Sequence, residues 1–383
     1  MSKAAELAAL IANVNKGSSL ANKNLVINGA FTVHQRKAIN TTSTENDNYA
    51  TADRFKPSAS NTDNLAITQQ VTNSSAPVGF ENSYKFVVTT AESALASNEL
   101  FRIMHFIEGQ NLQHLNYGIS SAKPVTLSFW VRSSLTGTYA VSMYAGSGAK
   151  IIGSTYAISS ADTWEKKEIT LVGDTAQAIT NDNTEGLRLN WILMAGSDYT
   201  GDSNASWVSY GSSKLAYGHT AAWGQSTSHD FYLAGVQLEI GEKATEFEHE
   251  PYDVTLRKCK RYFLRQLYYG YVCQLQNYAT TGAYGTIFPV QGMAGTPSVT
   301  TGGSDQNVLA QANSSATGGG GTGGSALTGI AVGGGMNNNS FGGVVRSGGT
   351  TVSGASGLVV GDCTVLYTSG SGSHVYFDVD AEL

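Results

Sequence analysis

The segment Val125–Arg132 alternates apolar and polar side chains with a period of two. In an extended chain, one face then carries Val125, Leu127, Phe129 and Val131. The opposite face carries Thr126, Ser128 and Arg132. A strand with one buried side requires this alternation, because successive side chains point to opposite faces of a sheet. The segment therefore predicts a strand that packs one face on a hydrophobic core.

Similar alternation or short apolar runs recur through the first two thirds of the chain, separated by turn-rich segments and without helical periods between them. The predicted strands are Leu25–Ile27, Leu65–Val71, Tyr84–Thr89, Phe101–Ile107, Val125–Arg132, Thr138–Tyr144, Trp164–Leu171, Leu187–Met194 and Asp230–Ile240. This order predicts an all-β fold, an antiparallel jelly-roll-like sandwich whose last strand is Asp230–Ile240. Because Trp130, Trp164 and Trp191 fall in strand patterns, we expect them in the core.

The composition agrees with strands and tight turns, since only 14% of the residues are charged and 44 are glycine. The net charge of −6 offers no basic surface for phosphates, which argues against nucleic acid and against anionic membranes as partners. No apolar run reaches the length of a transmembrane helix. The three cysteines, Cys259, Cys273 and Cys363, lack metal-site spacing and are expected as reduced, packed thiols.

A chain of 383 residues exceeds what one core usually serves, so we expect two compact units and a short appendage. Residues 1–23 form the appendage, a short N-terminal helix and a link. The helix repeats apolar residues at Leu7, Leu10, Ile11 and Val14. Because three isolated helical turns are marginal in water, this stripe predicts either an anchor to another protein or a leader lying on its own domain. Residues 24–250 form the sandwich.

A change in charge marks the predicted joint, residues 251–270. The acidic run comprises Glu239, Glu242, Glu246, Glu248, Glu250 and Asp253. The basic run that follows comprises Arg257, Lys258, Lys260, Arg261 and Arg265. A hinge held by ion pairs is favoured over a ligand site, with one short helical turn at Pro251 and Asp253 before extended structure resumes at Tyr262. Residues 271–383 are glycine-rich and predict a smaller C-terminal β domain.

Motifs for catalysis are missing from the sequence. It has no H-E-x-x-H, no Walker A and no G-x-S-x-G pattern, and its seven histidines never take metal-ligand spacing. His105 is expected to be a strand residue rather than a base. We therefore expect a protein that is not an enzyme. A glycosidase, whose two carboxylates the fold would bring together, stays an alternative.

A long loop from Tyr199 to Trp223 carries the best binding candidates. They are Tyr199, Trp207, Tyr210, Tyr217 and Trp223. Aromatic rings among small polar residues provide flat surfaces on which sugars stack. The alternative is that these rings fold back to cap the sandwich or fill a subunit interface.

Several ordered blocks resemble tail-fibre-like structural proteins of marine bacteriophages. The N-terminal blocks are residues 1–11 (MSKAAELAALI), 24–31 (NLVINGAF) with Gln35 and Arg36, and 51–55 (TADRF). The middle blocks are 107–112 (IEGQNL), 122–131 (AKPVTLSFWV), 136–139 (TGTY) and 163–167 (TWEKK). The strongest block is 234–241 (AGVQLEIG), which leads through 244–248 (ATEFE) to 259–263 (CKRYF). Phe288, Pro289, residues 293–297 and residues 380–383 (DAEL) also agree.

This resemblance implies a virion protein with a jelly roll like that of carbohydrate-binding modules, assembled in the host cytoplasm. It implies a homotrimer that attaches to other virion proteins through the N-terminal helix. The expected function is a tail fibre or receptor-binding subunit that contacts host surface polysaccharide without cleaving it. A purely structural head fibre, decoration or tail-joint protein is the first alternative, and a glycan-depolymerising tail spike is the second. A structural calcium can join the first and last strands of such jelly rolls; Glu239 could supply one oxygen, but no aspartate cluster accompanies it, so no cofactor is expected.

Overall fold

The structure, a computed structural model of the whole chain, describes Lys3 and residues 23–37, 39–40 and 49–269. Beyond these it describes residues 271–279, 282–284, 293–294, 298–303, 308–312, 325–326, 329–332, 350–353, 363–368 and 374–382. The predicted anchoring residues Leu7, Leu10, Ile11 and Val14 lie outside the described residues. The chain divides into two compact units, Met1–Leu256 and Arg257–Leu383.

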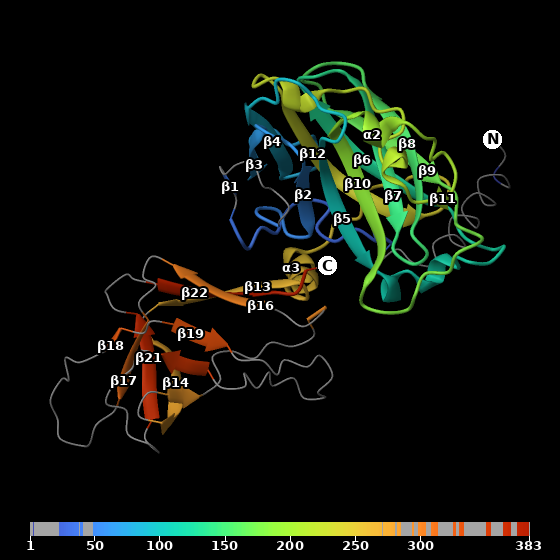
Figure 1. Cartoon of the computed structure of the whole chain (residues 1–383). Helices are drawn as coiled ribbons and strands as arrows, with labels where there is room; N and C mark the ends of the chain where they lie inside the picture. The colour runs from blue at the N-terminus through green and yellow to red at the C-terminus, as the bar shows by residue number, and fades with distance from the viewer. Residues whose placement is uncertain are drawn as a thin grey trace. The chain divides into compact units, whose positions relative to one another are not determined.

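The first unit is an antiparallel sandwich of two sheets, as predicted (Figure 1). One sheet has the order β1-β3-β4-β12-β6-β9 among the described strands. Its strands are β1 (Ile39–Asn40), β3 (Ala66–Thr72), β4 (Ser83–Thr90), β12 (Asp230–Ile240), β6 (Val125–Ser133) and β9 (Glu165–Leu171). The second sheet has the order β11-β8-β7-β10-β5-β2. Its strands are β11 (Val208–Ser209), β8 (Lys150–Ile158), β7 (Gly137–Ala145), β10 (Glu185–Ala195), β5 (Leu100–Glu108) and β2 (Phe55–Ser60).

Short helices occur in the connections of this unit. They are η1 (Gly109–Asn111), η2 (Gln113–Leu115), α2 (Ser197–Thr200), η3 (Ser212–Lys214) and η4 (Trp223–Gln225). Three of them, α2, η3 and η4, belong to the loop between β10 and β12. None of the helices that the structure describes has the length and apolarity that a membrane crossing needs.

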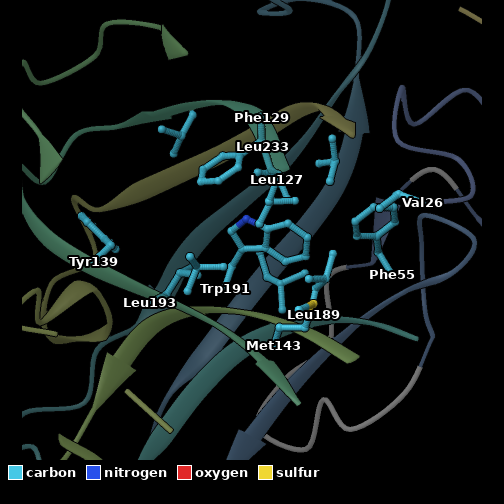
Figure 2. Close-up of a cluster of buried hydrophobic side chains, with 14 of the residues drawn as sticks. Val26, Phe55, Leu127, Phe129, Tyr139, Met143, Leu189, Trp191, Leu193 and Leu233 are labelled. Atoms are coloured by element: carbon cyan, nitrogen blue, oxygen red, sulfur yellow. The ribbon is translucent and has the colours of Figure 1, made fainter. Parts of the chain in front are cut away.

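The core lies between the two sheets and follows the predicted alternation (Figure 2). Leu127 and Phe129 of β6 meet Leu189 and Trp191 of β10 there, and all four side chains are fully buried. Trp191 packs edge-on against Phe129, with ring centroids 6.0 Å apart. Each large apolar side chain buried in this way contributes about 1.5–3 kcal/mol to folding. The core therefore fixes the register that decides which side chains face outward.

The sandwich lacks one predicted strand and contains strands that the sequence did not predict, among them β2 and β8. Leu25–Ile27 is not a strand, although its backbone is tied to β12 by Leu25 N–H donating to the Leu238 carbonyl at 2.8 Å. Strand β2 was not predicted because it contains Pro57, which its position at the edge of the sheet tolerates. Strand β8 was not predicted because Gly153 interrupts it, at a point where Asn204 approaches its backbone closely.

The tryptophan expectation is correct for Trp191 and wrong for Trp130 and Trp164. Trp191 is fully buried, whereas the other two are partly exposed. On β6 the core positions are Phe129 and Val131, so Trp130 between them takes the outer face. Trp164 precedes β9 and contacts Tyr232 edge-on at 6.0 Å on the same sheet.

Helix α3 (Tyr252–Lys260) is longer than the single turn predicted. The Pro251 carbonyl accepts hydrogen bonds from Val254 N–H and Thr255 N–H, which starts the helix. Asp253 in its first turn and three basic residues in its last turn complement the helix dipole. That charge arrangement explains the extra length.

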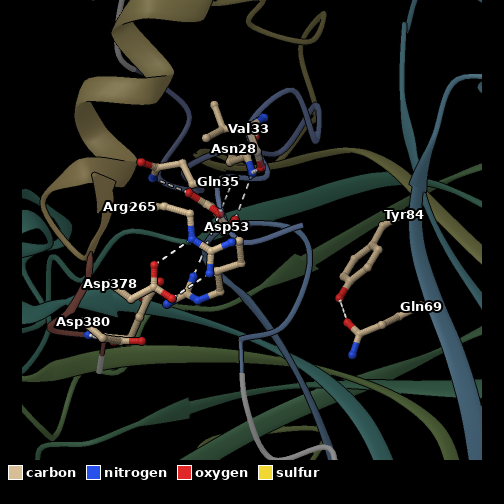
Figure 3. A network of polar contacts seen from close by, with 11 residues as sticks. Asn28, Val33, Gln35, Asp53, Gln69, Tyr84, Arg265, Asp378 and Asp380 are labelled. Atoms are coloured by element: carbon tan, nitrogen blue, oxygen red, sulfur yellow. Dashed lines mark hydrogen bonds and ion pairs between the residues drawn. The ribbon is translucent and has the colours of Figure 1, made fainter. Parts of the chain in front are cut away.

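The second unit is a set of short antiparallel strands. One sheet has the order β13-β22-β16, another β15-β14-β21-β17-β18, and β19 pairs with β20. The strands are β13 (Phe263–Tyr269), β14 (Tyr271–Ala279), β15 (Gly282–Tyr284), β16 (Ser298–Gly303), β17 (Val308–Ala312), β18 (Ser325–Ala326), β19 (Gly329–Val332), β20 (Thr350–Ser353), β21 (Cys363–Thr368) and β22 (His374–Asp380). Arg265 of β13 donates from Nε and Nη2 to the two carboxylate oxygens of Asp378, its cross-strand partner on β22, at 2.7 and 2.6 Å (Figure 3). Cys259 is buried, and the side chains of Cys273 and Cys363 lie outside the described residues.

The ion pairs predicted between the acidic and basic runs would cross the boundary between the units and stay a prediction. Within the first unit, the acidic run folds back on β12. Thr245 donates from its backbone N–H and its hydroxyl to the two oxygens of Glu239, both at 2.7 Å. Glu248 accepts the backbone N–H of Asn24 at 2.8 Å. These acids therefore fasten the start of the sandwich to its last strand.

Candidate functional site

A row of flat side chains crosses the outer face of the second sheet. Tyr144 of β7, Arg188 of β10 and Phe106 of β5 are direct cross-strand neighbours. The Arg188 guanidinium carbon lies 4.6 Å from the Tyr144 ring centroid and 5.5 Å from that of Phe106. Cation–π contacts of this kind hold the guanidinium flat. The contacts therefore fix the guanidinium over the Tyr144 and Phe106 rings, and Phe106 itself is 5% exposed.

Tyr210, from the loop between β10 and β12, extends this row. Its ring meets Tyr144 edge-on at 5.2 Å, and its backbone N–H donates to the Ala149 carbonyl at 2.7 Å. The Tyr210 side chain is 40% exposed, so an accessible phenol ring lies at one end of the row. Aromatic rings with a polar tip suit the apolar face and the hydroxyls of a sugar.

Polar groups surround the row. Glu185 lies beside Arg188, with its Oε1 3.5 Å from Nε of Arg188. Burial raises the pKa of the Glu185 carboxyl, although Arg188 and Arg102 act in the opposite direction. Burial likewise raises the pKa of the Tyr144 hydroxyl, and the charge of Glu185 adds to the effect. Tyr144 is thus a hydrogen-bond donor at neutral pH.

The loop that carries Tyr210 folds back over another part of the same face. Leu215 and Ala216 from the loop pack with Leu100, Ala140 and Ile192 in a small second core. Asn204 ties the loop together by donating to the Lys214 carbonyl at 2.7 Å. The alternative that this loop caps the sandwich is therefore correct for its middle part.

The structure separates the five aromatic candidates. Trp223 is fully buried and stacks on Phe101 at 5.5 Å, so it is a core residue and the prediction that it binds sugar is wrong. Tyr199 is partly buried and donates from its hydroxyl to the Asn98 carbonyl at 3.1 Å. Trp207 is partly buried against Tyr117, and its indole N–H donates to the Val172 carbonyl at 2.7 Å. Both side chains therefore have structural contacts.

Tyr217 is 42% exposed, like Tyr210, but lies at a different place. Thr220, three residues after Tyr217, donates its backbone N–H to the Thr138 carbonyl near the start of β7. Tyr210 instead contacts Tyr144, near the end of that strand. Six residues of extended chain span about 20 Å. Tyr210 and Tyr217 therefore do not form one patch.

Two carboxylates come together at the end of the row. Glu108 of β5 and Glu185 of β10 are cross-strand partners. Glu108 is fully buried and accepts a hydrogen bond from the Gln110 side chain. A hydrolytic nucleophile must reach the anomeric carbon of the substrate. Because Glu108 is buried, its carboxylate cannot reach a substrate on the surface.

Glu239, the one candidate calcium ligand, has protein partners at both oxygens. Besides the two bonds from Thr245, it accepts one from Gln237 Nε2 at 2.8 Å. Lys23 donates to the Thr245 hydroxyl and, at 2.6 Å, to the Glu246 carbonyl. Among the described residues, no three of His, Cys, Asp or Glu are grouped to hold a metal ion.

Residues of the N-terminal sequence blocks form a buried network of hydrogen bonds (Figure 3). Asn28 donates to the carbonyls of Val33 and Asp53, at 2.8 and 2.9 Å, and accepts Val33 N–H at 3.0 Å. The Asp53 carboxylate accepts the backbone and side-chain N–H groups of Gln35, at 3.0 and 2.6 Å. Burial raises the pKa of Asp53, and the bonds from Gln35 oppose this. The block residues Asn28, Gln35 and Asp53 thus serve folding.

His105 follows its prediction as a strand residue. It is fully buried on β5, and its ring lies 4.8 Å from that of Phe55. Burial, together with the charge of Arg54, lowers the pKa of His105 well below its usual value. It therefore stays neutral in the fold.

The central site residues Tyr144, Arg188 and Phe106 were not among the predicted candidates. Each lies on a predicted strand, at an outward position beside a core residue. Prediction of such a row requires the strand order and the register, and the sequence shows neither of them.

No family model matches the chain, and no curated protein does so at a significant level. Among solved structures, a putative sugar binding protein from Bacteroides thetaiotaomicron is 12% identical, with a TM-score of 0.31, over 57% of this chain and 100% of that one. The enzymatically active domain of tailspike protein 4 of bacteriophage CBA120 is 10% identical, with a TM-score of 0.30, over 57% of this chain and 22% of that one. A family 11 carbohydrate-binding module from Clostridium thermocellum is 9% identical, with a TM-score of 0.26, over 50% of this chain and 91% of that one. At these scores and identities the neighbours do not establish a shared ligand.

Proposed function

We propose that the protein binds a glycan, without cleaving it, on the outer face of β7, β10 and β5. The observation that carries this proposal is the continuous row of ring and cation–π contacts from Tyr210 through Tyr144 and Arg188 to Phe106. Rigid rings lose little conformational entropy on binding, which favours sugar stacking at such a surface. The polar groups of Glu185 and Tyr144 beside the row supply hydrogen bonds for hydroxyls.

The wider role we propose is a subunit of a bacteriophage fibre, assembled as a homotrimer and joined to other virion proteins through residues 1–23. The resemblance of the sequence blocks supports this role. Three copies of one weak site would bind a host polysaccharide with avidity. A purely structural head fibre, decoration or tail-joint protein is the rival role.

A binding experiment tests the site. The full chain is screened on a glycan array, and the affinity for the best neutral glycan is measured by calorimetry for the wild type and for Tyr210→Ala. We expect Tyr210→Ala to weaken binding about tenfold, which corresponds to ~1.4 kcal/mol. Tyr217→Ala is the matched control, because Tyr217 is equally exposed on the same loop but lies away from the row. Loss of binding in Tyr217→Ala instead of Tyr210→Ala would place the site elsewhere.

The cleavage alternative has one observation in its favour, the pairing of Glu108 with Glu185. We propose no cleavage because Glu108 is fully buried. Incubation of the protein with a polysaccharide that it binds, followed by measurement of the polysaccharide's length, tests for cleavage. Chain shortening that Glu185→Gln abolishes would make the protein a depolymerase.

Position and assembly need separate measurements. Gold-labelled antibody against the chain, applied to intact phage particles, distinguishes a tail fibre from a head fibre. Sedimentation of the purified full chain distinguishes a trimer from a monomer. Labelling at the head, with no glycan binding, would favour the structural rival.

A further inference from the structure

The outer face of the other sheet carries two cations above one aromatic ring. Lys85 of β4, Tyr232 of β12 and Arg132 of β6 are direct cross-strand neighbours. The Lys85 ammonium lies 5.3 Å from the Tyr232 ring centroid, and the Arg132 guanidinium carbon lies 5.0 Å from it. The ring itself is buried beneath them. Tyr232 therefore holds both cations in place before any ligand arrives.

The positive charge of this row is only partly balanced. Arg132 pairs with Asp162 at 3.3 Å, and the Asp162 side chain is 57% exposed. Such a surface pair is weak, because water screens it. Lys85 forms no ion pair with any residue in the part of the chain that the structure describes. An anion of matching size can therefore bind between Lys85 and Arg132 without displacing a strong internal partner.

Apolar ring surface lies next to these cations. Trp130 is two residues before Arg132 on β6, so both lie on the same face of the sheet, and Trp130 is partly exposed. Trp164 packs edge-on against Tyr232 at 6.0 Å and is fixed by its indole N–H, which donates to the Ser75 carbonyl at 2.9 Å. Flat apolar surface beside fixed cations is suited to a ligand with an anionic group and an apolar face.

We propose that Lys85 and Arg132 bind the carboxylate or sulfate group of an acidic sugar, with Trp130 contacting its ring. Charge-assisted hydrogen bonds to carboxylate or sulfate are about twice as strong as neutral ones, and the cations here need little ordering. A polynucleotide fits less well, because the whole chain carries a net charge of −6. This site is on the opposite sheet from the row at Tyr210, so it goes beyond the function proposed above.

The test uses the full chain with four soluble probes: polygalacturonate for carboxylate, carrageenan for sulfate esters, dextran as a neutral polymer, and single-stranded DNA as a polynucleotide. Affinity is measured by calorimetry at low and at physiological salt. We expect the wild type to bind at least one of the two acidic polymers, and this binding should weaken at high salt. Dextran carries no anionic group, so this face should not bind it. The variant Lys85→Gln should weaken acidic binding about tenfold, and Lys85→Gln with Arg132→Gln should abolish it.

Matched variants separate this site from the other one and from misfolding. Lys243→Gln removes one exposed charge elsewhere in the same unit and should leave affinity unchanged. Tyr210→Ala should reduce neutral-glycan binding without changing acidic binding, so the two proposals fail independently. Trp130→Ala should weaken acidic binding while leaving Lys85 and Arg132 in place. Thermal melting confirms that each variant is folded.

Four results would overturn the proposal: a folded wild type that binds neither acidic polymer, acidic binding unchanged in the double variant, acidic binding lost equally in Lys243→Gln, or single-stranded DNA binding more tightly than either polysaccharide. If carrageenan binds and polygalacturonate does not, the anionic group is a sulfate ester; the reverse result identifies a carboxylate.

Discussion

Nδ1 of His219 accepts a hydrogen bond from the backbone N–H of Ala140 at 3.2 Å. Its other ring nitrogen, Nε2, lies 2.7 Å from the Ala221 carbonyl and must therefore be the protonated one. These two bonds fix the neutral tautomer and tie the end of the Tyr210 loop to β7. Burial lowers the pKa of His219 to about 4. A second proton, on Nδ1, would face the N–H of Ala140.

Acid should therefore destabilise the sandwich. The folded pKa of His219 lies below its ordinary value of 6.5, so the unfolded chain binds more protons between those two values. The free energy of unfolding then falls as the pH falls through this window, by about 2 kcal/mol between pH 7 and pH 5. Asn at this position keeps an acceptor for Ala140 and cannot titrate. His219→Asn should remove about that much of the pH dependence.

Urea unfolding at pH 7 and pH 5, followed by tryptophan fluorescence, measures this difference. All five tryptophans lie in the first unit, so the signal reports the sandwich. His105, whose pKa burial also lowers, leaves some acid sensitivity in the variant. An equal pH dependence in wild type and His219→Asn would show that His219 does not act in this way.

Glu99 is a second buried titratable group, and its effect on the pH dependence of stability is opposite to that of His219. Its residue is 1% exposed, and its carboxylate accepts Ala96 N–H at 2.8 Å. Burial raises the pKa of Glu99, and the negative charges of Glu92 and Asp63 add to the effect. The ionised form therefore costs stability at neutral pH, and that cost disappears as the pH falls through the raised pKa.

Glu99→Gln should stabilise the sandwich at neutral pH by less than about 1 kcal/mol, because the charge is gone and the amide oxygen still accepts Ala96 N–H, but the bond from the backbone N–H of Asp63 is lost. Thermal melting in EDTA measures the gain without any contribution from divalent ions. Glu81→Gln, at an exposed position, is the control and should change little. A lower melting temperature for Glu99→Gln than for the wild type would show that the ionised carboxylate is needed.

Gly29 should tolerate no side chain. A Cβ atom there would lie 1.9 Å from the Val236 carbonyl oxygen, and Val236 N–H donates back to the Gly29 carbonyl at 2.9 Å. Gly29→Ala must push the N-terminal segment away from β12, so we expect a loss of roughly 3 kcal/mol or more in urea unfolding. Gly211→Ala is the matched control, because Gly211 is extended and its added Cβ would meet nothing closer than 3.9 Å. Equal midpoints for the two variants would contradict the close approach.

The sequence predicts the strands of the sandwich better than it predicts the surface. Strand β12 begins at Asp230 and ends at Ile240 as predicted, because apolar residues continue on both sides of the register shift between Ala234 and Gln237. Strand β2 escapes prediction because Pro57 is a strand breaker whose edge position only the fold reveals. Local patterns thus determine the strands wherever no breaker intervenes.

The candidate site depends on strand order instead. Tyr144, Arg188 and Phe106 are far apart in sequence and meet only because β10 pairs with both β7 and β5. Trp223 looked like a surface ring because its loop is polar, yet the loop folds inward there and stacks the indole on Phe101. A loop's composition does not tell which of its rings the core will accept.

The second unit offers a test of its own pairing. Arg265 and Asp378 form a two-pronged bond between β13 and β22, with side chains 25% and 16% exposed. Lysine keeps the charge but cannot make both bonds. Arg265→Lys should destabilise that strand pair by about 1 kcal/mol, which corresponds to roughly fivefold faster amide hydrogen exchange in β13 and β22.

Hydrogen exchange read by mass spectrometry resolves these two strands from the sandwich. Arg257→Lys is the control, because Arg257 is exposed and forms no ion pair with a residue that the structure describes. Tryptophan fluorescence should not change in either variant, since every tryptophan lies in the first unit. If exchange in β13 and β22 is the same in Arg265→Lys and Arg257→Lys, the charge alone is sufficient and the two-pronged geometry adds nothing to the stability of this sheet.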